Sequence, residues 1–250
     1  MKLNTIVNFL NEELKVDEFK NLDISMNGLQ VENLGQSVEK ICFAVDACAD
    51  TIEQAVEEGA DLLVVHHGLF WGKPIPLVRS HYNRIKALLD GNLALYACHL
   101  PLDAHPKYGN NVQIARALGL FEIKPFLNNI GCKGILEEDM SCTQIARIIS
   151  GQSSGLAECI LPFGTENIKT VGICSGAASM DVGEAIKVGL DAYITGDCRH
   201  EIYHTCKEEQ MNLISLGHYC TETFGVKALK QLIETEFKTE TSFIDIPVQL

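Results

Sequence analysis

The stretch Asp61-Leu62-Leu63-Val64-Val65-His66-His67-Gly68 decides the fold class, because a continuous apolar run ends in two adjacent histidines and a glycine. A short apolar run of this kind is typical of a strand buried in a parallel sheet. Two further strand-like runs, residues 93–98 and 213–217, lead directly into His99 and His218. Open parallel sheets bind ligands outside the carboxyl ends of their strands, so these histidines are candidate ligands of one polynuclear site.

Strand-like and helical patterns alternate along the chain. Apolar runs predict strands at 40–45, 61–66, 93–98, 170–174, 191–195 and 212–216. Apolar residues with helical spacing predict helices at 49–59, 83–90, 111–119, 143–150, 180–189, 200–210 and 223–237. Such alternation requires crossover connections, which place helices on the faces of largely parallel sheets. The predicted fold class is therefore α/β.

An internal repeat predicts two domains. Residues 53–63 resemble residues 183–193 at an offset of 130, which also aligns 41–43 with 171–173; the next strand repeats at an offset of 120. Any two strand-helix-strand units share small and apolar residues at such positions, so coincidence is the alternative explanation. We predict two linked, topologically similar α/β domains with a site between them. The predicted bounds are 1–127 and 128–240, with a last strand at 241–250 that returns to the first domain.

Composition restricts the class of function. Hydrophobic residues make up 46% of the chain and charged residues 21%, and no apolar run approaches the roughly 18 residues of a membrane span. A net charge of −13 argues against strong binding to duplex nucleic acid, which depends on Lys and Arg patches. The ten cysteines form no Cys-x-x-Cys pair, which favours a reducing cytoplasm. A small anionic substrate stays compatible with this charge if metal ions supply local positive charge.

The adjacent histidines favour a site with two metal ions. Neighbouring residues within a strand point to opposite faces, so His66 and His67 would not bind one ion if the strand continued through both. At the end of the strand, with Gly68 loosening the backbone, the two side chains can diverge toward two ions. The sequence therefore predicts a dinuclear centre.

Two carboxylates follow histidines at a spacing of four. His218 and Glu222 share one helix face if the helix has begun by His218, whereas Glu222 lies in the first turn if Thr221 is the N-cap. His99 and Asp103 have the same spacing, but Pro101 between them favours a loop. Histidines combined with carboxylates suit Zn, Fe, Mn, Co or Ni.

The predicted reaction class is metal-assisted hydrolysis. Two ions in this environment can hold a substrate oxygen and lower the pKa of a water molecule to about 7. A single histidine at a strand end is most often a surface residue, but a coincidence of three such ends is far less common. His105, His200 and His204 do not follow an apolar strand directly, so they are weaker candidates that could contact the substrate or the metal ligands. Nothing in the sequence marks Cys220 as an activated nucleophile, so it is predicted to be a residue of the pocket wall.

The chain resembles the Nif-three-like family, often labelled GTP cyclohydrolase 1 type 2 homologues and including the bacterial YbgI-type proteins. The resemblance runs nearly end to end. It rests on residues 27–31 (NGLQV), 65–71 (VHHGLFW), 99–105 (HLPLDAH), 109–111 (GNN), 195–197 (TGD), 217–222 (GHYCTE) and 243–247 (FIDIP). It implies metal ligands at His66, His67, Asp103, His218 and Glu222, with His99 as a pocket residue. It also implies a toroidal homohexamer whose dimetal sites face an internal cavity.

Three functions are compatible with these residues. The first is a dinuclear metal-dependent hydrolase that opens the ring of a purine nucleotide such as GTP, with His99 or His200 moving protons. The second is a non-enzymatic metal-binding scaffold or adaptor, and the third is a dimetal phosphoesterase acting on nucleotides. Candidate phosphate-binding cations are Lys73, Arg79, Arg84, Lys107 and Arg199.

Overall fold

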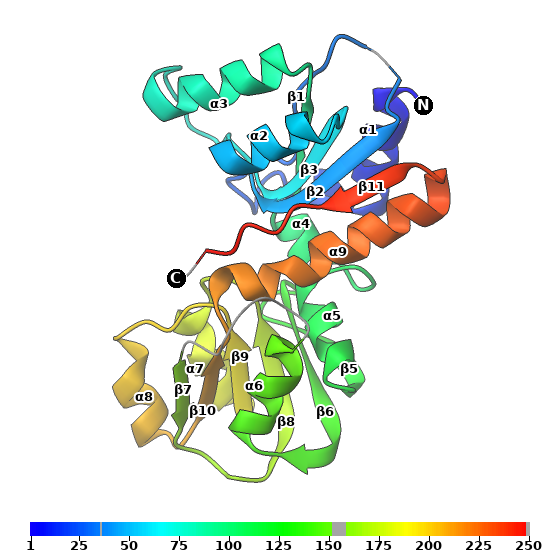
Figure 1. Cartoon of the computed structure of the whole chain (residues 1–250). Coiled ribbons are helices and arrows are strands. Elements are labelled where there is room, and N and C mark those ends of the chain that lie inside the picture. The colour runs from blue at the N-terminus through cyan, green and yellow to red at the C-terminus, as the bar shows by residue number, and fades with distance from the viewer. Residues whose placement is uncertain (36, 152–158, 249–250) are drawn as a thin grey trace. The chain divides into compact units, whose positions relative to one another are not determined.

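The protein divides into two compact units, each built on its own sheet (Figure 1). The computed structural model describes residues 1–35, 37–151 and 159–248 of the 250 residues. Unit 1 comprises Met1–Leu102 and Val226–Ile246, and unit 2 comprises Asp103–Gly225 together with the described residues after Ile246. Both units combine a sheet with helices, so the predicted α/β class with two similar domains is confirmed.

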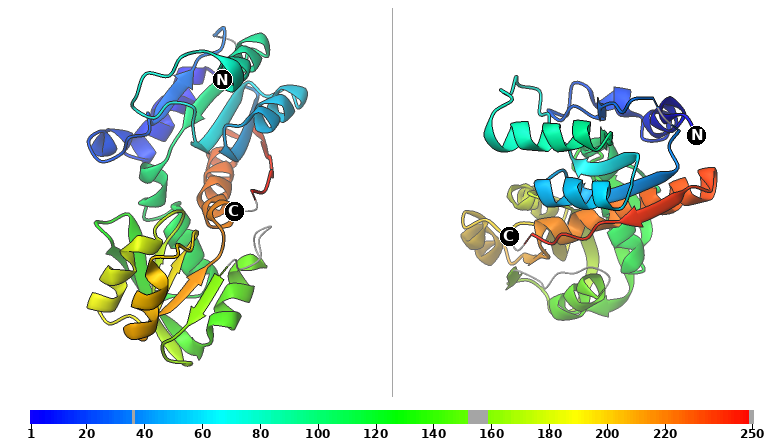
Figure 2. Two further views of the ribbon diagram at one scale, coloured as in Figure 1. Left: turned by 90° about the vertical axis from the view of Figure 1, so that its left-hand side faces the viewer. Right: turned by 45° about the horizontal axis from the view of Figure 1, so that its top comes forward.

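The sheet of unit 1 has five strands in the order β1-β4-β3-β2-β11. Neighbouring strands pair in parallel except β1, which is antiparallel to β4. The last strand lies beside β2, as Figure 2 shows. Residues 249 and 250 of the predicted tail lie outside the described residues. The elements of this unit are α1 (Leu3–Glu13), η1 (Val16–Phe19), β1 (Gly28–Val31), β2 (Lys40–Asp46), α2 (Ala49–Glu57), β3 (Leu62–His67), α3 (Arg79–Asp90), β4 (Ala94–Ala97) and β11 (Glu240–Phe243).

Helices cover both faces of this sheet. On one face, the alternate strand residues Leu63 and Leu95 pack with Ile52 of α2 and Leu88 of α3. On the other face, the buried Tyr96 hydroxyl donates to Asn11 of α1 at 2.9 Å. Because both faces are buried, strands β2 to β4 are continuous apolar runs, which is why the sequence pattern predicts them well.

The sheet of unit 2 has six strands in the order β5-β6-β8-β9-β10-β7. The central strands β8, β9 and β10 are parallel, whereas the outer strands pair antiparallel. The sequence patterns do not predict β1, β5, β6 and β7; β5, for example, is exposed at four of its six positions and lacks an apolar run. The elements are α5 (Asn110–Ala117), β5 (Phe121–Phe126), β6 (Gly131–Met140), α6 (Cys142–Ser150), β7 (Cys159–Pro162), β8 (Ile168–Cys174), η2 (Ser179–Asp181), α7 (Val182–Lys187), β9 (Ala192–Thr195), α8 (Ile202–Glu208) and β10 (Asn212–Ser215).

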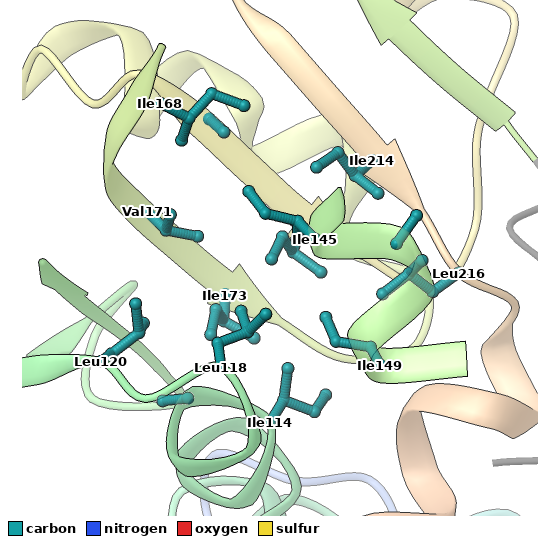
Figure 3. Close-up of a cluster of buried hydrophobic side chains, with 14 of the residues drawn as sticks. Ile114, Leu118, Leu120, Ile145, Ile149, Ile168, Val171, Ile173, Ile214 and Leu216 are labelled. Atoms are coloured by element: carbon teal, nitrogen blue, oxygen red, sulfur yellow. The ribbon is translucent and has the colours of Figure 1, made fainter. Parts of the chain in front are cut away.

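The bounds of the units differ from the predicted domain bounds at 127 and 240. One boundary falls within α4 (Leu100–Asp103) and the other within α9 (His218–Phe237). Helix α5 belongs to unit 2 because Ile114 and Leu118 pack into its core beside Ile173 (Figure 3). Periodicity alone does not reveal which sheet a helix covers, so this assignment required the tertiary structure.

The first two parallel strands of the internal repeat have equivalent register in the two units. Ile41 pairs with Leu62 in unit 1, and Val171 pairs with Ala192 in unit 2, with 130 residues between the equivalent positions. The next strand repeats differently, because Leu62 pairs with Ala94 whereas Ala192 pairs with Asn212. Its structural offset is therefore 118 and not the 120 of the sequence alignment. A shift of two residues keeps every side chain on the same face of the sheet. The sequence alignment therefore matched the alternation of side chains in this strand, but not the residues that pair with the neighbouring strand.

In each repeat an aspartate bridges the starts of two neighbouring parallel strands. The Asp61 carboxylate accepts hydrogen bonds from the backbone N–H groups of Glu39 and Lys40, at 2.8 and 3.2 Å. The Asp191 carboxylate accepts from the N–H groups of Lys169 and Thr170, at 3.0 and 2.7 Å. These aspartates therefore fix where the first two parallel strands of each unit begin to pair.

Replacing Asp191 with alanine is expected to lower the free energy of unfolding by about 1 to 3 kcal/mol, because it leaves half-buried backbone donors unsatisfied. Urea denaturation followed by circular dichroism measures the change. Asp139→Ala is the matched control, since Asp139 is half exposed and its ion pair with Lys169 at 3.6 Å lies on the surface. Equal destabilisation by both substitutions would contradict this role of Asp191.

Candidate metal centre

Unit 1 gathers three histidines at the carboxyl ends of β3 and β4. His66 and His67 close β3, and His99 follows β4, its parallel neighbour. One ring nitrogen from each of the three lies within 4.8 Å of the others. The rings of His66 and His67 are only 4.7 Å apart between centroids, so strand alternation does not separate them at the end of the strand. The structure thus brings the two predicted metal ligands, His66 and His67, together with His99, the predicted pocket residue.

A hydrogen bond on Nδ1 orients each of these histidines. His66 Nδ1 lies 2.9 Å from the Cys98 carbonyl oxygen, which can only accept, so Nδ1 carries the proton. His67 Nδ1 lies 2.8 Å from Asp46. His99 Nδ1 lies 3.0 Å from Asp23. These acceptors favour the tautomer whose Nε2 has a lone pair, which is the usual arrangement of histidines that bind metals.

The Asp23 carboxylate holds His99 in place. It is buried, which by itself would raise its pKa, but hydrogen bonds from His99 and Asn27 and the charge of His99 lower the pKa to about 2. Its second oxygen accepts from the backbone N–H of Leu100 at 3.0 Å. Trp71 contacts the His99 ring edge to face at 5.1 Å. This aspartate is therefore ionised at neutral pH and fixes both the ring and the start of α4.

Unit 2 places His218 and Glu222 on one face of α9. The helix begins at His218, so the first of the two predicted alternatives is correct, and Thr221 does not cap it. His218 Nε2 lies 3.2 Å from Glu222, which is 3% exposed, and His218 Nδ1 lies 3.0 Å from Asp197. Thr221 instead accepts from the N–H of Gly176 at 3.1 Å.

The two carboxylates keep His218 protonated in the absence of metal. Burial disfavours the charged ring, but the hydrogen bond and charge of Glu222, reinforced by Asp197, raise the pKa of His218 to about 9. A metal ion and a proton compete for the same Nε2 lone pair. The site is therefore anionic enough to bind a cation in place of the proton.

Asp103 is the second buried carboxylate of unit 2. It ends α4, so the predicted loop is wrong: Pro101 lies in the first turn of this short helix, where a missing N–H costs nothing. Asp103 Oδ1 accepts from Asn110 Nδ2 at 2.8 Å and from Ser175 Oγ at 2.9 Å. These two donors orient the Asp103 carboxylate.

Two glycines allow close packing at these positions. A Cβ on Gly68 would collide with Gln30 and Ala97, so this glycine provides space and not the loosened backbone that the sequence suggested. Gly176 has φ +65°, and a Cβ there would collide with Glu222 Oε1. Gly176 therefore permits both the left-handed turn and the position of the carboxylate.

Gly176→Ala is expected to displace Glu222 and to reduce metal binding in addition to destabilising the fold. Gly189→Ala is the matched control, because Gly189 has φ +70° but no atom within 4 Å of its Cβ position. Both variants should lose on the order of 1 kcal/mol of stability through backbone strain. Metal analysis by mass spectrometry separates them, since only Gly176→Ala should lose metal; equal metal content would contradict the close-packing argument.

The other histidines singled out in the sequence, and Cys220, lie outside the cluster formed by His66, His67 and His99. His105 Nδ1 accepts from the N–H groups of Lys107 and Tyr108, at 3.2 and 3.0 Å, so its proton is on Nε2. His200 is exposed in the turn before α8, and His204 is exposed on that helix. Cys220 is buried in the core of unit 2, as expected of a wall residue, and all ten cysteines are thiols.

Sequence reasoning missed the residues that orient the ligands. Asp46 ends β2 beside His67 and could have been found by the strand-end rule applied to the histidines. Asp197 lies in the motif at 195–197 but had no assigned role. Asp23 and Ser175 carry no local signal, because their roles depend on contacts with residues 76 and 72 positions away.

Comparison with known proteins supports one family. The family model described as Duf34/NIF3 (NGG1p interacting factor 3) matches residues 1–249. Proteins named GTP cyclohydrolase 1 type 2 homolog are 41% identical in Pyrococcus abyssi, covering all of both chains, and 40% identical in Treponema pallidum, covering 94% of each.

Two solved structures support the same assignment over the whole chain. A crystal structure from Thermus thermophilus is 38% identical with a TM-score of 0.93, and the structure of protein ybgI, of unknown function, is 33% identical with a TM-score of 0.91. Both comparisons cover 100% of each chain. The strand ends that carry the histidines, the repeated register and these matches agree, and the chain belongs to the Duf34/NIF3 (NGG1p interacting factor 3) family.

Proposed function

We propose that this protein is a dinuclear metal-dependent hydrolase that opens the ring of a purine nucleotide, resembling GTP cyclohydrolase 1 type 2. The observation that carries the proposal is the histidine cluster of unit 1, in which acceptors on Nδ1 leave Nε2 as the ligand atom. The proposed ligands of two divalent ions are His66, His67, Asp103, His218 and Glu222. The metal is Zn, Fe, Mn, Co or Ni, because imidazole and carboxylate together suit these ions.

The residues present fit such ions. Imidazole nitrogens oriented through carboxylates and carbonyls, together with buried carboxylates, are the usual surroundings of borderline metals. When bound, two such ions would polarise the substrate and activate water for hydrolysis. Asp46 and Asp197 would hold the rings of His67 and His218, while Asn110 and Ser175 would hold the Asp103 carboxylate.

His99 and His200 are the proposed proton-transfer residues, and the contacts favour His99. Its Nδ1 lies 3.0 Å from the ionised Asp23, which orients the ring so that Nε2 can exchange a proton with the substrate. His200 is exposed and lies in a turn. Trp71, in contact with His99, also lines a pocket of about 440 Å³ in unit 1 and offers an aromatic surface to a purine.

Incubation of the fully metallated protein with GTP tests the reaction. Hydrolytic opening of the imidazole ring should release formate or leave a ring-opened nucleotide, which chromatography and mass spectrometry detect. Release of phosphate alone would identify a phosphoesterase instead. Absence of turnover with several metals and nucleotides would favour the non-enzymatic scaffold or adaptor.

We also propose that the protein is a cytoplasmic homo-oligomer, a toroidal hexamer in solution, as the family resemblance implies. Light scattering coupled to gel filtration measures the mass directly. Within residues 1–35, 37–151 and 159–248, no helix is long and apolar enough to cross a membrane.

A further inference from the structure

A pocket of unit 2 opens beside Asp103. It has a volume of about 380 Å³, which is within the range of small-molecule sites. It lies between α5 and the hairpin of β5 and β6, elements that are neighbours in the fold (Figure 1). Its walls combine apolar residues such as Val112 and Ile123 with the polar residues His105, Arg116 and Lys124.

The polar lining of this pocket suits an anion. Arg116 and Lys124 bring two positive charges to one cavity of a chain whose net charge is −13. Arg116 donates from one guanidinium nitrogen to the Lys107 carbonyl at 2.6 Å, which positions the group and leaves other donors of its planar fork for a ligand. His105 also lines the pocket.

Two carboxylates, those of Glu122 and Asp103, contribute negative charge near the pocket. Lys124 pairs with Glu122 at 3.1 Å, but both side chains are more than half exposed, so the pair is weak and an anion can replace it. The Asp103 carboxylate is held by Asn110 and Ser175 and is one of the proposed metal ligands. A ligand in this pocket would therefore meet a lining that contains two cationic side chains and the proposed metal ligand Asp103.

We propose that this pocket binds the phosphate group of a small phosphorylated molecule whose other end lies toward Asp103. This inference rests on the proposed function, to which it adds the residues that bind the phosphate group of the substrate. Arg116 and Lys124 bind the phosphate, and Val112 and Ile123 supply apolar wall to the same pocket. Neither Arg116 nor Lys124 was among the phosphate candidates that the sequence suggested.

The test compares GMP with guanosine by isothermal titration calorimetry on metal-free protein, so that phosphate cannot bind to metal ions. GMP should bind more tightly than guanosine, and Arg116→Gln should weaken GMP about ten-fold without changing guanosine. Arg116→Lys should recover part of the loss, because it keeps the charge but not the fork. Arg147→Gln, an exposed arginine of α6 outside this pocket, is the charge-matched control and should change nothing.

Three results would overturn the proposal: equal affinities for GMP and guanosine, equal losses in Arg116→Gln and Arg147→Gln, or no binding of either compound. Failure of the proposed function is a separate outcome. A protein that binds GMP through Arg116 but contains no metal would refute the dinuclear hydrolase and leave the pocket assigned. Circular dichroism of each variant verifies that the fold is intact.

Discussion

Replacing His67 with alanine is expected to remove bound metal from the protein. The substitution deletes an imidazole that lies in the histidine cluster of unit 1 and is oriented by Asp46 at 2.8 Å. Removing a residue that only orients a metal ligand typically costs about 10- to 100-fold in metal affinity, and removing the ligand itself should cost more. We therefore expect His67→Ala to lose more metal affinity than Asp46→Ala.

His105→Ala is the control for this series. The lone pair of His105 Nδ1 is already engaged by two backbone N–H groups, so its tautomer is the opposite of that of His67. Metal content measured by inductively coupled plasma mass spectrometry should be unchanged in this variant. If His105→Ala lost as much metal as His67→Ala, or if Asp46→Ala lost none, the tautomer argument for the site would fail.

Replacing Glu222 with glutamine is expected to abolish metal binding in unit 2 and to lower the pKa of His218 from about 9. Burial disfavours the charged ring, and Glu222 is the main group that opposes this effect, through a contact of 3.2 Å. Glutamine keeps the shape of the side chain but removes its charge. Nuclear magnetic resonance titration of the histidine rings in metal-free protein measures the pKa directly.

The raised pKa of His218 also predicts two pH dependences. A group whose pKa rises on folding stabilises the folded state below its unfolded pKa of 6.5, and this contribution is lost as the pH rises to about 9. Metal-free wild-type protein should therefore lose stability between pH 6.5 and 9, and Glu222→Gln should lose less.

Metal binding should release a proton in the same interval, so that apparent metal affinity rises about ten-fold per pH unit. Competitive titration against a chelator at several pH values tests this, and a flat profile would contradict it.

The candidate ligands could be found in the sequence because they lie at the ends of strands. The strands β2 to β4 and β8 to β10 are buried and apolar, so their ends are visible as points where polar residues begin. His66, His67, His99 and His218 all lie at such points. The repeat between Asp61 and Asp191 was visible for a related reason, since the same contact between neighbouring strands at the start of each parallel pair uses the same residue type.

The partners of those ligands could not be predicted in the same way. Asp23 contacts His99 across 76 positions, and Ser175 contacts Asp103 across 72. Residues that form such contacts follow no periodic pattern, because only the packing of distant segments brings them together. The pocket beside Asp103 illustrates the same limit, because Arg116 lies on a predicted helix whereas Lys124 lies on β5, a strand that the sequence pattern did not predict.

The α/β class, the repeated unit and the histidines at the strand ends can all be recognised in the sequence, because burial of a parallel sheet imposes continuous apolar runs that stop where the candidate ligands begin. The tertiary structure was needed to show which acceptors orient the rings of His66, His67 and His99, why residues 68 and 176 are glycine, and which sheet α5 covers. These features depend on hydrogen bonds and steric contacts between residues far apart in the chain, and no local pattern of amino acids encodes them.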